Sequence, residues 1–127
     1  MALPFRLEKD ITFEAAHHLP LHDGKCKRVH GHSWKGTIVV EGKTLIKSGA
    51  KSGMLQDYGD IKAAVQHLLD GYLDHHDLNV TTGLTNPTSE ELAQWIYQML
   101  KPKLSMLAEV IVEETCSARC IYRPFQG

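Results

Sequence analysis

Residues 5–17 alternate between apolar and polar side chains, a pattern typical of a β-strand with one buried face. The odd positions of this segment are Phe5, Leu7, Lys9, Ile11, Phe13 and Ala15. Residues 30–42 form a second such segment, whose even positions are His30, His32, Trp34, Gly36, Ile38 and Val40. Because side chains two residues apart in a strand project to the same side, the pattern predicts two strands that each turn one face to a core.

Two helices are expected between these strands and the C-terminal part of the chain. The first follows Asp57 or Asp60 as N-cap and carries an apolar stripe of Ile61, Ala64, Val65, Leu68, Leu69 and Tyr72. The second begins at a capping box, Thr88 to Glu91, and ends near Pro102. Strand-like segments at 108–115 and 119–123 complete the order ββααββ. This order predicts an α+β fold, with two helices on one face of an antiparallel sheet and a single domain over residues 1–127.

Composition excludes several classes of protein. The net charge of −1 gives no electrostatic basis for binding nucleic acid or an anionic membrane, and the apolar runs are too short for a membrane span. The first residues, MALPFRLEKD, lack the apolar stretch of a secretory signal. Three cysteines are an odd number, which favours reduced thiols. We therefore expect a cytoplasmic protein with no membrane or nucleic-acid partner.

The segment CKRVHGHSW, residues 26–34, predicts a metal site. His30 and His32 project from the same side of a strand, with only a glycine between them. A third ligand is expected from the neighbouring strand, which ends in His17 and His18. His17 shares the parity of the buried positions and is preferred over His18. Three neutral imidazoles suit Zn²⁺ and leave a fourth position open, as a catalytic site requires.

Cys26 leaves two possibilities open. It could be a fourth ligand that closes the site and makes it structural, or a free thiol close to the metal. The spacing C-x3-H-x-H does not match the common structural zinc fingers. Cys116 and Cys120, spaced C-x3-C, are expected to be small buried side chains.

Two acidic groups are further candidates. In the segment Asp74–Asp77, a carboxylate beside a histidine can orient the ring for proton transfer, although from sequence alone a solvated polar loop is the more common explanation of the pattern. Glu114 shares the parity of Val110 and Val112, which would place a carboxylate on an apolar face. A bulge would instead turn Glu113 inward, so parity alone does not decide between the two.

Six segments together resemble the 6-pyruvoyl-tetrahydropterin and 6-carboxy-tetrahydropterin synthase family. In chain order they are FEAAHHLP, CKRVHGHSW, GMLQDYGDIK, LDHHDLN, NPTSEELAQWI and ETCSARCIY. The resemblance implies the tunnelling fold, in which a four-stranded antiparallel sheet carries two helices on one face. It also implies a homo-oligomer, a trimer or a dimer of trimers, with active sites between subunits.

The resemblance also assigns roles to individual residues. It implies Zn²⁺ ligation by His17, His30 and His32. The residues that it implies for catalysis are Cys26, Asp74, His75 and Glu114. Glu114, with Thr115 beside it, would bind the pterin ring, which favours Glu114 over Glu113.

The short cysteine-to-histidine spacing looks like the bacterial branch that serves queuosine and 7-deazapurine biosynthesis. That branch converts 7,8-dihydroneopterin triphosphate to 6-carboxy-5,6,7,8-tetrahydropterin, acetaldehyde and triphosphate. Gln56 and Arg119 depart from the family pattern. The alternatives are a 6-pyruvoyl synthase, a zinc-dependent pterin or purine hydrolase, and a zinc-stabilised oligomer without catalysis.

Overall fold

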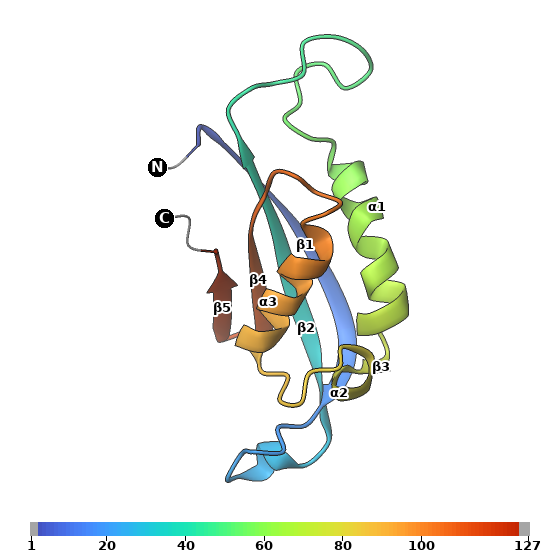
Figure 1. Ribbon diagram of the computed structural model, residues 1–127, viewed down its shortest axis with the longest axis vertical. Coiled ribbons are helices and arrows are strands. Elements are labelled where there is room, and N and C mark those ends of the chain that lie inside the picture. Colours follow the sequence, from blue (N-terminus) through green and yellow to red (C-terminus); the bar gives the residue numbers. More distant parts are fainter. Residues whose placement is uncertain (1–2, 125–127) are drawn as a thin grey trace.

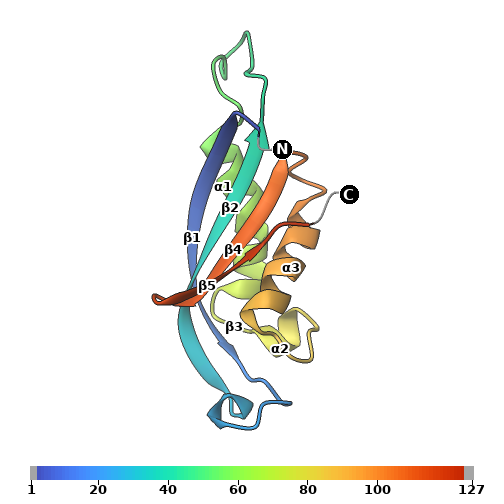
Figure 2. The same ribbon diagram turned by 90° about the vertical axis from the view of Figure 1, so that its left-hand side faces the viewer.

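A computed structural model describes residues 3–124 and shows a twisted sheet with helices on one face (Figures 1 and 2). The strands are β1 (Phe5–His17), β2 (His30–Gly42), β3 (His76–Asp77), β4 (Leu107–Thr115) and β5 (Ala118–Tyr122). The helices are α1 (Tyr58–Leu68), α2 (Leu78–Thr81) and α3 (Ser89–Leu100), with a 3₁₀ turn at Lys25–Lys27 and a π-helical turn at Leu69–Leu73. Among the described residues, none of the helices combines the length and apolarity that a membrane crossing requires.

The sheet has the order β3-β1-β2-β4-β5, and its four long strands, together with α1 and α3, follow the predicted ββααββ arrangement. The α+β prediction is confirmed. The sheet has one strand more than the expected four, because β3 pairs in parallel with β1 at Ala15 and Ala16. A strand of two residues is too short for any alternation of apolar and polar side chains, so the sequence pattern could not reveal it.

The predicted parity of the first two strands is confirmed. β1 and β2 pair without a bulge from Phe5 opposite Gly42 to His17 opposite His30. Along β1, alternate residues from Ile11 to His17 are buried, and the residues between them are more exposed. This buried side meets α1 and α3 and contributes to one apolar core.

Both main helices begin at side-chain caps. Asp57 caps α1 by accepting a hydrogen bond from the backbone N–H of Gly59 at 2.7 Å. Thr88 caps α3 through a 3.1 Å bond from the backbone N–H of Glu91. Of the two predicted N-cap candidates for α1, the structure shows Asp57 and not Asp60. The predicted N-cap of α3, Thr88, is confirmed.

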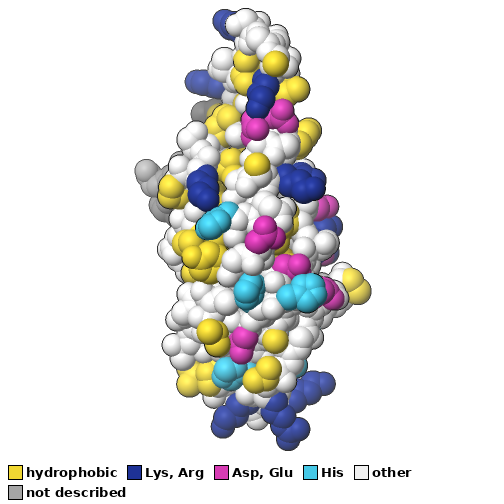
Figure 3. Space-filling view, turned by 90° about the vertical axis from the view of Figure 1, so that its right-hand side faces the viewer, with side chains coloured by type: hydrophobic (Ala, Val, Ile, Leu, Met, Phe, Trp, Pro, Cys, Tyr) yellow, Lys and Arg dark blue, Asp and Glu magenta, His cyan; other side chains and the backbone are white. Residues whose placement is uncertain are grey.

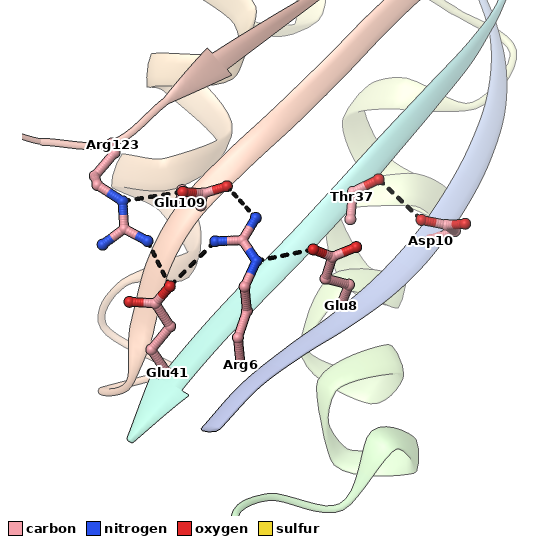
Figure 4. Close-up of polar contacts among 7 residues, drawn as sticks. All are labelled: Arg6, Glu8, Asp10, Thr37, Glu41, Glu109 and Arg123. Atoms are coloured by element: carbon pink, nitrogen blue, oxygen red, sulfur yellow. Dashed lines mark hydrogen bonds and ion pairs between the residues drawn. The ribbon is translucent and has the colours of Figure 1, made fainter. Parts of the chain in front are cut away.

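The other face of the sheet is charged rather than apolar. Arg6, Glu41, Glu109 and Arg123 form a closed ring of alternating charges across β1, β2 and β4 to the end of β5 (Figure 4). Arg6 also reaches Glu8 at 2.8 Å. Glu109 is buried, and its two arginine partners keep its charge compensated. This network joins the strands at the end of the sheet remote from the β1–β2 loop (Figures 1 and 4).

Candidate metal centre and active site

Three histidines converge where β1 ends and β2 begins. The ligand nitrogens of His17, His30 and His32 all lie within 4.8 Å of one another. His17 stands directly opposite His30 in the β1–β2 pairing, while His32 lies two residues further along β2 on the same side. The cluster therefore follows from strand register alone, as the sequence pattern predicted. Three nitrogens gathered in this way could hold a metal ion.

Backbone carbonyls orient two of these rings. The Nδ1–H of His17 donates to the carbonyl oxygen of Pro87 at 2.8 Å. The Nδ1–H of His30 donates to the carbonyl oxygen of Arg28 at 2.7 Å. Since each Nδ1 carries the proton, each Nε2 keeps a free lone pair for a metal ion.

Burial of His17 and His32 favours the neutral form of these two rings, which is the form that binds metals. Desolvation lowers the pKa of both His17 and His32. His17 is fully buried against the indole ring of Trp34, with the ring centroids 5.0 Å apart. The Nε2 atoms of His17 and His32 are buried and have no hydrogen-bond partner among the described residues. Two orphaned ring nitrogens that face one point fit a bound metal ion.

Glu114 faces the same point from β4. Its Oε1 atom lies 3.3 Å from Nε2 of His17 and 3.7 Å from Nε2 of His32. Glu113 lies instead on the charged face, 3.6 Å from Lys35. The structure thus places Glu114, and not Glu113, at the histidine cluster. Strand parity alone could not decide between the two.

Asp74 and His75 lie beside β1, in the turn before β3. One carboxylate oxygen of Asp74 accepts the backbone N–H of Glu14 at 2.9 Å, and the other lies 3.1 Å from Nδ1 of His75. His75 has a positive φ of 61°, which is uncommon for a residue with a side chain. Its ring is largely exposed. The hydrogen bond from Glu14 lowers the pKa of Asp74 and the contact with His75 adds to this, so the carboxylate is charged.

One residue of the Asp74–His75 pair and one of the three histidines line the same open hollow. His75 and His32 both line a cavity of about 570 Å³, together with Ser33 and Asp77. Among the described residues, no hydrogen bond or ion pair joins Asp74 or His75 to the three histidines.

Cys26 lies apart from these contacts. It belongs to the 3₁₀ turn of the β1–β2 loop, where its carbonyl oxygen accepts the N–H of Leu19. Among residues 3–124, no hydrogen bond joins its thiol to the three histidines or to His75. Thr115 ends β4 and is exposed. The prediction of a buried side chain is wrong for Cys116, which is exposed in the β4–β5 turn, whereas Cys120 is half-buried.

Sequence reasoning missed the groups that hold the site residues in place. Pro87 and Glu14 act through backbone atoms, which carry no residue-specific signal. Asn79 bonds both to the end of β1 and to the loop after α2. The letters LDHHDLN contain it, but nothing in their spacing shows that its side chain meets β1.

Comparison with known proteins agrees with this geometry. A family model described as 6-pyruvoyl tetrahydropterin synthase matches residues 6–124. The chain is 43% identical over 115 residues to a Synechocystis protein named 6-carboxy-5,6,7,8-tetrahydropterin synthase, covering 90% of this chain and 89% of that protein. A Bacillus subtilis protein of the same name is 35% identical over 132 residues, covering 97% and 88%.

A solved structure shows the same architecture. It is the Caenorhabditis elegans 6-pyruvoyl tetrahydropterin synthase, which matches with a TM-score of 0.81 and 28% identity over 98% of this chain and 99% of that one. The α+β sheet with helices on one face is therefore the tunnelling fold of these enzymes. From the family match and the curated relatives, the chain belongs to the 6-pyruvoyl tetrahydropterin synthase family.

Proposed function

We propose that this protein converts 7,8-dihydroneopterin triphosphate and water to 6-carboxy-5,6,7,8-tetrahydropterin, acetaldehyde and triphosphate. The reaction would serve queuosine and 7-deazapurine biosynthesis. One observation carries the proposal: His17, His30, His32 and Glu114 converge on one point in a chain whose curated relatives bear that enzyme's name. Because the ring of the substrate gains two electrons that its side chain loses, the overall conversion needs no external reductant.

Zn²⁺ is the metal we propose for the three histidines. Imidazoles suit it, two of them with tautomers set by backbone carbonyls, and three protein ligands leave a position for substrate. Bound Zn²⁺ would supply Lewis-acid stabilisation of negative charge that develops on a substrate oxygen.

Cys26 would accept a proton from the substrate side chain as a thiolate. Lys25, Lys27 and Arg28 flank it, and among the described residues none of them forms an ion pair. Basic side chains gather at the end of the molecule that this loop forms (Figure 3). Their positive charge would favour the thiolate and attract a polyphosphate. A cytoplasmic setting, which we also propose, keeps this thiol reduced.

The remaining roles follow from position. His75, held by the Asp74 carboxylate, would carry the proton across the shared cavity. Glu114 would accept hydrogen bonds from the N–H groups of the pterin ring, with Thr115 beside it, and fix the ring in place. Glu114 lies at the histidine cluster, and His75 lines the hollow that His32 also borders.

We also propose a homo-oligomer. Beyond the β3 pairing, the outer edge of β1 has no strand partner among residues 3–124, and neither has the outer edge of β5. Open edges are sites of strand addition. Edge-to-edge association of β1 with β5 of another copy would therefore extend the sheet around a ring.

Product analysis tests the proposed reaction. The zinc-loaded protein is incubated with 7,8-dihydroneopterin triphosphate, and the products are identified by mass spectrometry. Acetaldehyde in equal amount to a 6-carboxy-tetrahydropterin is the expected result. Absence of both products from protein with a full complement of zinc would refute the proposal.

A 6-pyruvoyl product without acetaldehyde would support the second candidate, a 6-pyruvoyl synthase. The likeness to the Caenorhabditis elegans enzyme favours that alternative, since the fold is shared over nearly the whole chain. The two reactions differ in carbon–carbon cleavage, so acetaldehyde alone separates them.

A further inference from the structure

The chain segment 74–79 lies along the outer edge of β1 where the metal ligands begin (Figure 1). Asp74 and His75 bond to the backbone of Glu14, and β3 then pairs with Ala15 and Ala16. At the end of this edge, the backbone of His18 is met by a side chain rather than by a strand. That side chain belongs to Asn79, at the second position of α2.

The Asn79 amide uses both of its ends. Its Oδ1 accepts the backbone N–H of His18 at 2.9 Å, and its Nδ2 donates to the His18 carbonyl at the same distance. The two bonds reproduce the pair that a neighbouring strand would form. The Nδ2 also donates to the carbonyl oxygen of Thr85 at 3.2 Å. One side chain thus joins the residue after a metal ligand to the loop that precedes α3.

That loop carries the carbonyl group that orients His17. Pro87 lies two residues after Thr85, and its oxygen accepts the Nδ1–H of His17. The buried imidazole therefore has its β1 backbone on one side and this carbonyl on the other. Asn79 fixes the distance between the two, because it bonds to both segments.

We propose that Asn79 is a positioning residue of the metal centre, which clasps the Pro87 loop to the end of β1 and so fixes the tautomer and orientation of His17. The role requires an acceptor and two donated hydrogen bonds from one short side chain, which an amide provides and a carboxylate does not. Loss of a residue that orients a metal ligand through hydrogen bonds typically weakens metal binding about 10–100-fold. This inference rests on the proposed metal site.

The test compares Asn79→Asp with Thr81→Val. Aspartate retains the acceptor for the His18 N–H and loses both donors. Thr81 lies in the same short helix, and its hydroxyl donates to the carbonyl oxygens of Tyr72 at 2.6 Å and Asp77 at 3.2 Å, but not to His18 or Thr85. Val replaces it without change of shape, so this control measures disturbance of α2 alone. Zinc affinity is measured by competition with a chromophoric chelator, and thermal unfolding of the metal-free proteins is recorded in parallel.

We expect Asn79→Asp to weaken zinc binding about tenfold or more, and Thr81→Val to leave it within about twofold, whatever the fall in Tm of either variant. In ¹⁵N-resolved NMR spectra of the zinc-loaded protein, the Nδ1–H resonance of His17 should move upfield in Asn79→Asp only, because its hydrogen bond lengthens. Pro87→Gly loosens the same loop. The double variant Pro87→Gly/Asn79→Asp should therefore lose less zinc affinity than the sum of the losses in the two single variants.

Two outcomes would overturn the proposal and are distinguishable. Wild-type protein that binds no zinc refutes the metal site and this role together. Wild-type protein that binds zinc, with affinity unchanged in Asn79→Asp or reduced equally in Thr81→Val, refutes the positioning role alone.

Discussion

The carbonyl oxygen of Pro87 lies 2.8 Å from Nδ1 of His17, although 70 residues separate them in the chain. This contact determines which nitrogen of a fully buried imidazole carries the proton. It leaves Nε2 directed at His30, His32 and Glu114. A sheet strand and a helix-capping loop thus prepare one ligand before any metal arrives.

Replacement of His17 by alanine should abolish stoichiometric zinc binding, with a fall in affinity of at least about a hundredfold, because one of three ligands is lost. His18→Ala is the matched control, since the adjacent residue has the opposite parity. Metal content after dialysis, measured by atomic emission, checks both. Zinc retained by His17→Ala but lost from His18→Ala would mean that the strand register places the wrong histidine at the site.

Glu114→Gln should lower kcat/KM about 30-fold, which corresponds to the loss of about 2 kcal/mol from hydrogen bonds to a charged acceptor. Glu113→Gln should change it little, because that carboxylate pairs with Lys35 on the charged face. Steady-state kinetics with the pterin substrate compares the two variants. Equal losses in both would contradict the assignment of Glu114 to the pterin.

His75→Gly should stabilise the fold while it slows the reaction. The positive φ of His75 costs about 1 kcal/mol, and glycine adopts this conformation freely. Loss of the imidazole should lower kcat about 10²–10⁴-fold if it transfers a proton. Urea unfolding and turnover are measured on the same preparation. A variant that keeps full turnover would exclude His75 from catalysis.

The Glu109 carboxylate should make stability depend on pH in the acid range. The hydrogen bond from Arg6 and the weaker one from Arg123 hold its pKa below the usual value. Because the unfolded pKa is about 4.3, the ion pairs stabilise the fold above that pH, and this contribution is lost as pH falls through the lower folded value. Glu109→Gln should cost about 2 kcal/mol at pH 7, since the two arginines are partly hydrated.

The decisive comparison is the Tm of wild type and Glu109→Gln between pH 7 and pH 3. The gap between them should narrow below about pH 4.3. A constant gap across this range would show that the carboxylate titrates as it does in the unfolded chain. Glu8→Gln, at the exposed side of the same network, should change Tm little at any pH in this range.

Most of the site could be predicted from two rules, strand parity and family resemblance. Parity placed His17 beside His30 and His32 because β1 and β2 pair without a bulge. Strand parity does not account for the burial of Val39 and Glu109, because both side chains lie on the charged face of the sheet and are nevertheless buried. Burial there depends on contacts between strands far apart in the sequence.

The residues that hold the site in place could not be predicted. Asn79, Pro87 and Glu14 act through backbone contacts that only the folded chain creates. β3 was missed because two residues show no periodicity. Residue types therefore indicate which groups perform chemistry, while tertiary structure determines how they are oriented.

X-ray absorption at the zinc K-edge most directly tests the central claim, that three imidazoles hold a metal with Cys26 outside its coordination shell. We expect a shell of nitrogen and oxygen atoms at about 2.0–2.1 Å, with imidazole scattering from three histidines and an identical spectrum for Cys26→Ala. A sulfur atom at about 2.3 Å that disappears in Cys26→Ala would contradict this claim and make the centre a closed, structural one.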